Sequence, residues 1–352
     1  MGTPYVTVLV DTYNHERFIE EAVVSVMGQD FPRSEMEIVV VDDGSTDRTP
    51  EIVSKFAPRV RLMRKANGGQ ASAFNAGIRE ARGEIVAFLD GDDWWAANKL
   101  TRVAEAIRTD GSVGIVGNGL VVASADGQRR QETLRQGFRF RANTREGARL
   151  FRVRKSLLGT SRMTLRRELL ERIGTVPETL RIEADEYVFT LAAALADAQI
   201  LPDTLTFYRL HESNSYQFSR RDADKARTKQ QMLTALVAAL TAGLERAGID
   251  LRVRREITAI LQAEADQLRL SLEGGWPWET LRAEWTIYGI LHPETSGLRS
   301  ALGALKLLPA LALPPRVFYE MRQKIAESDA YLRFRSAHPW IAKPEMQHVE
   351  RN

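Results

Sequence analysis

Residues 85–93 read IVAFLDGDD, an apolar run followed directly by three aspartates in four positions. Three shorter apolar runs rich in β-branched residues come before it, at Val6–Val10, Ile38–Val41 and Val60–Met63. Runs of this kind are typical of parallel strands that are buried on both faces. The four runs therefore predict the strands of a parallel sheet.

Helical stretches separate these runs, at Glu16–Met27, Asp47–Phe56 and Ala71–Ala81. Asp47 suits a helix N-terminus, and Pro58 marks the end of the second stretch. Strand–helix–strand repetition of this kind predicts right-handed crossovers and an α/β, doubly wound layer.

The pattern then changes twice along the chain. The pattern predicts strands between Ser112 and Gln136, a strand that runs into a short helix at Leu165–Ile173, a helix at Asp185–Ala196 and a strand at Leu205–Tyr208. These elements complete a domain of residues 1–220. We divide this domain into halves of about 1–110 and 111–220. Residues 221–352 form a helical C-terminal region, because apolar residues keep helical spacing between the cap Asp250 and the glycines at 274–275.

Composition excludes several classes of site and partner. The 352 residues include no cysteine, which removes disulfides, thiolate nucleophiles and Cys-ligated zinc, and fits a reducing compartment. The net charge of +3 is spread along the chain, so it does not indicate a nucleic-acid partner. The N-terminus enters its first strand at once and shows no signal peptide, and no segment is long enough to span a bilayer. We therefore expect a cytoplasmic protein.

Acidic residues follow the predicted strands. Asp11 ends the first strand, Asp42 and Asp43 end the second, and the aspartates of residues 90–93 end the fourth. The carboxyl ends of the strands in an open parallel sheet line the ligand crevice. A group of like charges at this edge calls for a cation, and hard oxygen ligands favour Mg²⁺ or Mn²⁺ over zinc. The alternative for residues 42–47 is a turn followed by a helix cap.

A glycine-containing loop opens onto the same edge. Asn67, Gly68 and Gly69 follow the third strand and precede the third helix. Glycines before a helix N-terminus let backbone N–H groups approach an anion, although Asn-Gly is also an ordinary turn.

These stretches together resemble the inverting glycosyltransferases of family 2, which have the Rossmann-like GT-A fold. The resemblance covers about residues 4–215. It rests on Thr7–Asn14, Val40–Asp47, Asn67–Gly77, the Asp-X-Asp motif within residues 90–93, and the order of Arg166–Glu168, Ile173-Gly174 and the region of Asp185.

The resemblance implies a nucleotide-sugar-binding half at 1–110, an acceptor half at 111–220 and a role for each matched residue. Asp43 would hydrogen-bond the base, Asp90 would reach the ribose, and Asp92 would hold a Mg²⁺ or Mn²⁺ ion at the diphosphate. His211, in a further matching stretch, would touch the metal or the diphosphate. The remaining nucleotide-sugar-binding residues would be Thr12, Tyr13, Asn14, Asn67, Gly68, Gly69 and Gly91.

Asp185 would be the general base. The family usually has Glu-Asp at this point, whereas this chain has Ala184-Asp185, so Glu183 and Glu186 are the alternative bases. Asp185 is also suited to be the N-cap of the following helix.

The implied reaction moves one hexosyl or related sugar, with inversion, from a nucleoside-diphosphate sugar to an acceptor hydroxyl. A UDP-sugar is the favoured donor, the acceptor is a saccharide, a lipid-linked molecule or another hydroxyl compound, and the setting is cell-surface polysaccharide or glycoconjugate assembly. The Gln-X-X-Arg-Trp signature of processive synthases is absent, which favours single-sugar transfer. A second departure is Phe74, where the family usually carries an arginine.

Two other classes of protein are alternatives to this function. A nucleotidyltransferase would carry a glycine-rich, basic loop after the first strand, where this chain has Asp11–Asn14. A non-catalytic nucleotide-sugar-binding or scaffold protein stays open, and measured turnover separates it from an enzyme.

The C-terminal region carries a candidate membrane contact at 299–324. Ala301–Leu313 is apolar and has cationic flanks, which suits peripheral binding to an anionic lipid surface. The alternative is a buried helix that packs on the catalytic domain.

Overall fold

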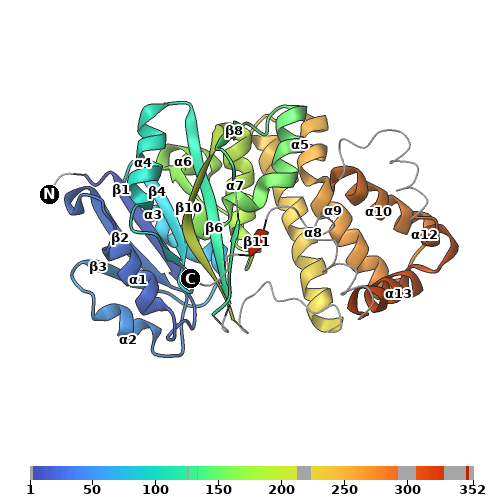
Figure 1. Cartoon of the computed structure of the whole chain (residues 1–352), viewed down its shortest axis with the longest axis horizontal. Helices are drawn as coiled ribbons and strands as arrows, with labels where there is room; N and C mark the ends of the chain where they lie inside the picture. The colour runs from blue at the N-terminus through green and yellow to red at the C-terminus, as the bar shows by residue number, and fades with distance from the viewer. Residues whose placement is uncertain are drawn as a thin grey trace.

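A mixed sheet with helices on both faces forms the N-terminal part of the protein, in a computed structural model (Figure 1). The structure describes residues 3–124, 127–132, 134–211, 223–291, 307–328 and 346–348. The four predicted strands are present as β1 (Val6–Thr12), β2 (Met36–Asp42), β3 (Val60–Arg64) and β4 (Ile85–Asp90). They pair in parallel in the order β3-β2-β1-β4, so their carboxyl ends share one edge.

The second half of the sheet contains both strand directions. β9 (Thr164–Arg166) is antiparallel to β4 and to the long strand β6 (Val113–Ser124), which in turn runs parallel to β10 (Asp197–Leu210). The shorter strands lie along this half: β5 (Trp94–Trp95), β7 (Arg129–Glu132), β8 (Phe138–Phe140) and β11 (Met346–His348). The result is the curled mixed sheet expected of a GT-A fold.

Helices cover the two faces of the sheet because successive strand residues alternate between them. Val8 and Val10 pack with α1 (Ile19–Met27) and α4 (Lys99–Thr109), whereas Leu9 packs with α3 (Gln70–Glu80) and α7 (Ala184–Leu195). The other helices of this part are α2 (Thr49–Ser54), α5 (Arg145–Arg154), α6 (Arg167–Ile173) and the 3₁₀ turns η1 (Arg33–Glu35), η2 (Lys155–Leu158) and η3 (Thr160–Arg162).

Helix α1 begins at Ile19, whereas the sequence pattern placed its start at Glu16. The residues before it form a turn in which Asn14 has a positive φ of 56°. The backbone N–H of His15 donates to the Thr49 hydroxyl at 2.9 Å, so the turn is held by the loop after β2 and cannot continue the helix.

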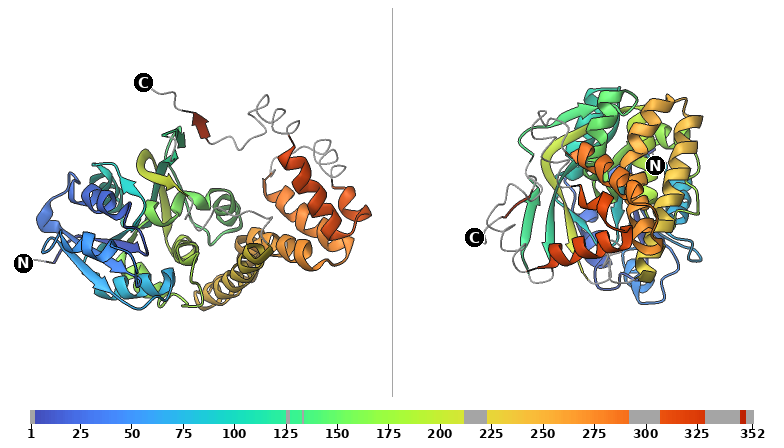
Figure 2. Two further views of the ribbon diagram at one scale, coloured as in Figure 1. Left: turned by 90° about the horizontal axis from the view of Figure 1, so that it is seen from below. Right: turned by 90° about the vertical axis from the view of Figure 1, so that its right-hand side faces the viewer.

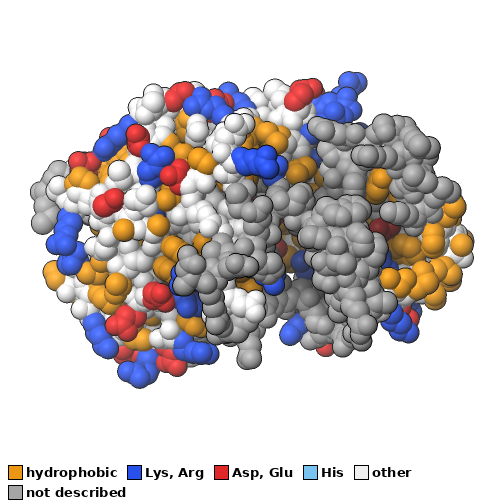
Figure 3. Space-filling model, viewed as in Figure 1, with side chains coloured by type: hydrophobic (Ala, Val, Ile, Leu, Met, Phe, Trp, Pro, Cys, Tyr) orange, Lys and Arg blue, Asp and Glu red, His pale blue; other side chains and the backbone are white. Residues whose placement is uncertain are grey.

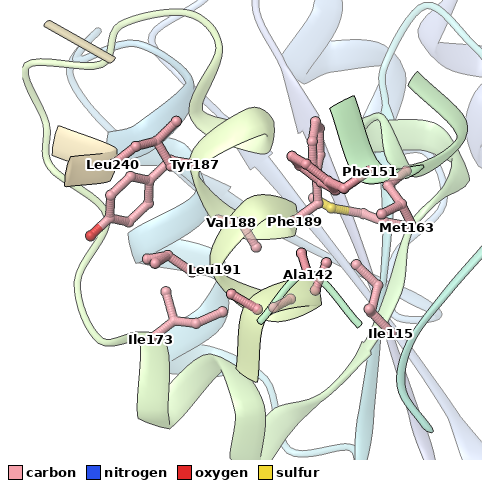
Figure 4. Packing of buried hydrophobic residues seen from close by; sticks show 14 of the residues in the cluster. Ile115, Ala142, Phe151, Met163, Ile173, Tyr187, Val188, Phe189, Leu191 and Leu240 are labelled. Atoms are coloured by element: carbon pink, nitrogen blue, oxygen red, sulfur yellow. The ribbon is translucent and has the colours of Figure 1, made fainter. Parts of the chain in front are cut away.

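Helix α7 lies at the centre of the larger hydrophobic core (Figure 4). Val188, Phe189 and Leu191 point into this core, and nearly every residue of the helix is buried. Tyr187 meets Leu240 of α8 (Ala223–Arg246) in the same cluster. Close packing on all sides of a buried helix holds it in place, and this fixes its first turn, which bears Asp185.

The described part of the C-terminal region is mainly helical, as predicted, and its helices extend away from the sheet (Figure 2), whereas Met346–His348 form the strand β11 beside β7. It contains α8, α9 (Leu251–Glu273), α10 (Pro277–Leu291), α12 (Pro309–Ala312) and α13 (Pro315–Glu327). The Asp250 carboxylate caps α9 by accepting from the Arg252 N–H at 2.8 Å, and Gly274 ends it with a φ of 84°. Residues of α8 and α9 share the core of α7, and the domain division at about residue 220 stays a prediction.

Among the described residues, no helix combines the length and the apolar character needed to cross a membrane.

Candidate active site

The register of the parallel strands brings the first acidic residues together. Asp11 on β1 is the direct neighbour of Asp90 on β4, and Thr12 is the neighbour of Asp42 on β2. The backbone N–H of Gly91 donates to the Asp11 carbonyl at 2.9 Å, which continues the pairing past the end of β4. Carboxylates that are distant in the sequence therefore meet at the carboxyl edge of the sheet.

Asp43 is bound by the glycine-containing loop. Its buried carboxylate accepts from the Gly68 N–H at 3.0 Å, from the Gly69 N–H at 2.7 Å and from Lys65 Nζ at 2.5 Å. The anion that these backbone N–H groups hold in the structure is thus the side chain of Asp43. The loop and the end of β2 form one connected wall of the site.

The turn after β1 forms the neighbouring wall. The backbone N–H of Asn14 donates to the Ser45 hydroxyl at 2.9 Å, and the side-chain Oδ1 of Asn14 accepts from the Thr46 N–H at 2.8 Å. Tyr13, between these anchored positions, is exposed. An exposed ring on a fixed turn beside Asp43 is a suitable surface for a flat base.

Gly91 allows a close approach between this turn and the aspartate motif. A Cβ at position 91 would lie 2.6 Å from the Thr12 hydroxyl and 2.9 Å from His15 Nδ1, so a larger residue would force the two segments apart. The Thr12 hydroxyl and His15 Nδ1 are themselves 3.2 Å apart.

Asp92 is contacted by two histidines. Its Oδ2 lies 2.9 Å from His211 Nε2 and 3.8 Å from His15 Nε2. Burial raises the pKa of Asp92, but the hydrogen bond from His211 and the neighbouring imidazoles outweigh it, and the pKa lies below the ordinary value. The structure thus brings His211 to the aspartate motif. His15 was not singled out from the sequence, although its place directly after Thr12–Asn14 is a usable signal.

Three further aspartates at this edge, Asp11, Asp90 and Asp93, have pKa shifts in the opposite direction. Burial first, and then the charge of a neighbouring aspartate, raises the pKa of Asp11, Asp90 and Asp93 well above the ordinary value. Asp93 accepts from the Arg209 N–H at 2.9 Å, while Asp11 Oδ1 is buried and has no hydrogen-bond partner in the described part of the chain. These carboxylates crowd one another in a way that a cation would relieve.

A divalent metal fits this set of ligands. Asp90, Asp92 and Asp93 each bring a carboxylate oxygen to within 4.8 Å of the others, and Asp11 adds the unpaired buried oxygen. Carboxylates of this density, with no thiolate, match the oxygen-rich coordination of Mg²⁺ or Mn²⁺.

Asp185 lies in the first turn of α7 and is buried. Its carboxylate accepts from the Thr160 N–H at 3.2 Å and from the Glu186 N–H at 2.8 Å. Burial, followed by the charge of Glu186, raises its pKa. The residue before the helix is Glu183, in a left-handed conformation with φ 64°, so Asp185 is not the N-cap.

Glu186, one of the two alternative bases, forms a short ion pair with Lys155. Its carboxylate is therefore already engaged with a cation that is itself largely buried. Asp185 lies near the aspartate cluster, because adjacent residues of one turn, Thr160 and Ser161, bind Asp185 and Asp90.

The turn η3 connects the aspartate cluster with Asp185. Thr160 binds Asp185, as described above, and the Ser161 hydroxyl accepts from the Asp90 N–H at 3.1 Å. The Ser161 carbonyl oxygen in turn accepts from three side chains of three elements: Trp95 Nε1 at 2.8 Å, Lys99 Nζ at 2.8 Å and the Thr206 hydroxyl at 3.0 Å. No motif marks Thr160 or Ser161, so sequence reasoning missed this connection.

Phe74 has no access to the site. It is fully buried, and its ring centroid lies 4.9 Å from that of Phe88 in the core under the sheet. Position 74 therefore contributes packing to the core and no cation to the acidic edge.

The sequence matches the family described as Glycosyl transferase family 2 over residues 7–174. A relative in Nostoc sp., an uncharacterized glycosyltransferase, is 33% identical over 240 residues, which cover 64% of this chain and 71% of the relative.

Two solved structures are similar in fold. The mannosyltransferase PcManGT from Pyrobaculum calidifontis, in complex with GDP-Man and Mn²⁺, is 26% identical with a TM-score of 0.51, and the match covers 97% of this chain and 89% of that one. TarS 1–349 from Staphylococcus aureus, in complex with UDP-GlcNAc, is 21% identical with a TM-score of 0.52, covering 81% of this chain and 88% of that one.

Proposed function

Because this chain belongs to glycosyltransferase family 2, we propose that it transfers one sugar, with inversion, from a nucleoside-diphosphate sugar to an acceptor hydroxyl. The observation that carries the proposal is the cluster of Asp90, Asp92 and Asp93 at the carboxyl edge of the sheet, which the turn η3 connects to the buried Asp185. This edge offers a wall for a nucleotide, ligands for a metal and a separate buried carboxylate.

The proposed roles are those that the family resemblance implies, and the positions of the residues in these walls support them. Tyr13, Asn14 and Asp43 line the position of the base, together with the loop of Asn67, Gly68 and Gly69. Asp90 faces the ribose, and Thr12 and Gly91 let the two loops approach closely. Asp92 and His211 would hold the metal, with Asp93 beside them.

Asp185 acts as the general base. The acceptor hydroxyl transfers its proton to the Asp185 carboxylate, and its oxygen forms a bond to the anomeric carbon. The bond from that carbon to the diphosphate breaks, and the electron pair leaves with the nucleoside diphosphate. One displacement without a covalent intermediate inverts the configuration. A bound Mg²⁺ or Mn²⁺ would supply positive charge for the diphosphate oxygens.

A thermal-shift panel tests the proposal. UDP-sugars and GDP-sugars are each added with and without Mn²⁺ or Mg²⁺, and a donor at 100 times its Kd stabilises the native state by about 2.7 kcal/mol. We expect a metal-dependent rise in Tm with one donor, a UDP-sugar by preference, and loss of the metal-dependent part in Asp92→Asn.

The same panel separates the rival functions. Release of nucleoside diphosphate with a hydroxyl acceptor establishes transfer. Binding of a donor without any turnover across saccharide and lipid-linked acceptors would indicate a non-catalytic nucleotide-sugar-binding protein. Release of pyrophosphate from a nucleoside triphosphate would indicate a nucleotidyltransferase.

We place the enzyme in the cytoplasm, acting on a saccharide or lipid-linked acceptor in cell-surface glycoconjugate assembly, with α12 and α13 at the membrane surface. Leu308 and Leu311 are 53% and 46% exposed, and Val317, Met321 and Ile325 form an exposed stripe along α13. Figure 3 shows hydrophobic side chains gathered at this end of the molecule. Residues 299–306 of the predicted contact lie outside the described residues.

Leu308→Ser/Leu311→Ser is expected to weaken flotation with vesicles that contain phosphatidylglycerol, because each change removes exposed apolar surface from the contact. Leu307 is left unchanged, since it is only 9% exposed and packs inside. Leu251→Ser, at a position 47% exposed on α9, is the matched control. Equal flotation of both variants and the wild type, with intact circular dichroism spectra, would rule out this contact.

A further inference from the structure

The donor proposed to bind at the acidic edge is itself an anion. Cationic side chains near this edge would therefore favour its binding. Several cationic side chains in the described part of the chain contact the loops of this edge, and four of them lie next to the residues proposed to bind the donor. Three are paired with carboxylates: Arg64 with Asp42, Lys65 with Asp43 and Arg209 with Glu21. The fourth, Arg181, is exposed, and its guanidinium contacts a neutral group, the side-chain oxygen of Asn67.

The backbone of Arg181 is fixed against the loop that binds Asp43. Its carbonyl oxygen accepts from the Gln70 N–H at 2.8 Å. A Cβ at Gly69 would lie 2.6 Å from the Arg181 Cα, and Gly69 has a φ of 86°, so only glycine suits this contact. The side chain of Arg181 therefore starts from a well-defined point on the rim of the site.

Arg181 stands between the two ends of the proposed donor site. On one side, the Gly69 N–H donates to Asp43, and Gly69 packs closely against the backbone of Arg181. On the other side, the Ala184 N–H donates to the Gln70 side chain at 2.9 Å, and Asp185 follows directly in α7. A donor molecule that reaches from the base at Asp43 to the anomeric carbon at Asp185 must place its diphosphate between these ends.

We propose that Arg181, oriented by Asn67, binds the diphosphate of the donor. This inference rests on the proposed function and adds a binding residue to it. A guanidinium presents a planar fork of N–H donors that matches phosphate oxygens, and charge-assisted hydrogen bonds of this kind are the stronger ones. The diphosphate would also give the Arg181 guanidinium an anionic partner, where the structure shows it in contact with the neutral side chain of Asn67.

The test compares ligands that differ only in their phosphates. Binding of UDP and of uridine, with Mn²⁺ present, is measured by ligand-observed NMR for the wild type and for Arg181→Met, which keeps side-chain length without charge. We expect UDP to bind about 10-fold to 100-fold more weakly to the variant. Uridine should bind equally well to both proteins, and Arg181→Lys should fall between them.

The control is Arg79→Met, an exposed arginine at the far end of α3 from the loop, which should bind UDP as the wild type does. GDP and guanosine replace UDP and uridine if the wild type prefers guanine. Unchanged UDP binding in Arg181→Met, or an equal loss for UDP and uridine, would overturn the role of Arg181 and leave the proposed function standing. A wild type that binds neither diphosphate would overturn both.

Discussion

Asp185→Asn is expected to slow sugar transfer by about 10²-fold to 10⁴-fold, the usual contribution of a general base. The amide has nearly the same shape as the carboxylate and keeps an oxygen for the Thr160 N–H, but it cannot accept the acceptor proton. Donor binding should therefore be unchanged while kcat falls. Initial rates of nucleoside diphosphate release and a separate donor titration measure the two effects.

Glu186→Gln is the matched control for this substitution. Because Lys155 already binds the Glu186 carboxylate, we expect its loss to change the rate less than 10-fold, about the limit of an indirect effect. A large loss of rate in Glu186→Gln, together with an active Asp185→Asn, would show that Glu186 and not Asp185 is the general base. Glu183→Gln tests the remaining alternative in the same assay.

The pH profile gives an independent check on Asp185. Only the ionised carboxylate accepts a proton, so the rate should rise with pH through the pKa of Asp185, which burial and then the charge of Glu186 raise. Glu186→Gln removes the second of these causes. The acidic limb of its profile should therefore move to lower pH, whereas a purely structural role for Asp185 predicts no such movement.

Glu132→Gln is expected to lower the free energy of unfolding by about 3–5 kcal/mol, the usual effect of breaking a buried ion pair. Glu132 on β7 forms a short ion pair with Arg162, and both side chains are buried. The variant leaves the guanidinium charged and without its counter-ion inside the protein. Urea denaturation followed by circular dichroism measures the change.

An exposed pair provides the comparison. Glu171→Gln breaks the ion pair with Arg167 on the surface of α6, and such pairs contribute about 0–1 kcal/mol. Replacing both Glu132 and Arg162 by methionine should cost less than Glu132→Gln alone, since no unpaired charge remains. Equal stability of Glu132→Gln and the wild type would mean that Arg162 is already compensated by the carbonyl oxygens of Asn118 and Ser156.

The parallel half of the fold could be predicted because its signals are local. Each strand is an apolar run, and each aspartate of the site follows such a run directly, so the strand ends determine where Asp11, Asp43 and Asp90 meet. The helical region was equally accessible, because α9 keeps one apolar face between the cap Asp250 and Gly274.

The rest depends on contacts between distant segments. Nothing near residue 160 shows that η3 binds Asp90 on one side and Asp185 on the other. Lys99 is fully buried, and its amine donates hydrogen bonds to the side chains of Asn118 and Thr206 and to the carbonyl of Ser161. The residues near Thr160 and Lys99 in the sequence do not indicate these partners. Such contacts between distant segments are visible only in the structure.

The position of Arg181 illustrates the same limit. Its sequence neighbours give a loop between two helices, and its relation to Asn67 depends on how α3 and α7 pack beside each other on one face of the sheet. A glycine at 69 is visible in the sequence as a turn residue. That it is needed to admit the backbone of Arg181 is a tertiary fact.

The three donors on the Ser161 carbonyl also give the site a form of mutational robustness. Trp95, Lys99 and Thr206 come from different elements, and loss of any one leaves two hydrogen bonds on the same oxygen. A single substitution can therefore leave the turn between Asp90 and Asp185 in place, even where it destabilises the core in which these buried side chains pack. A second substitution would destabilise the turn more than the first, so the effect of a substitution at each position depends on the residues at the other two.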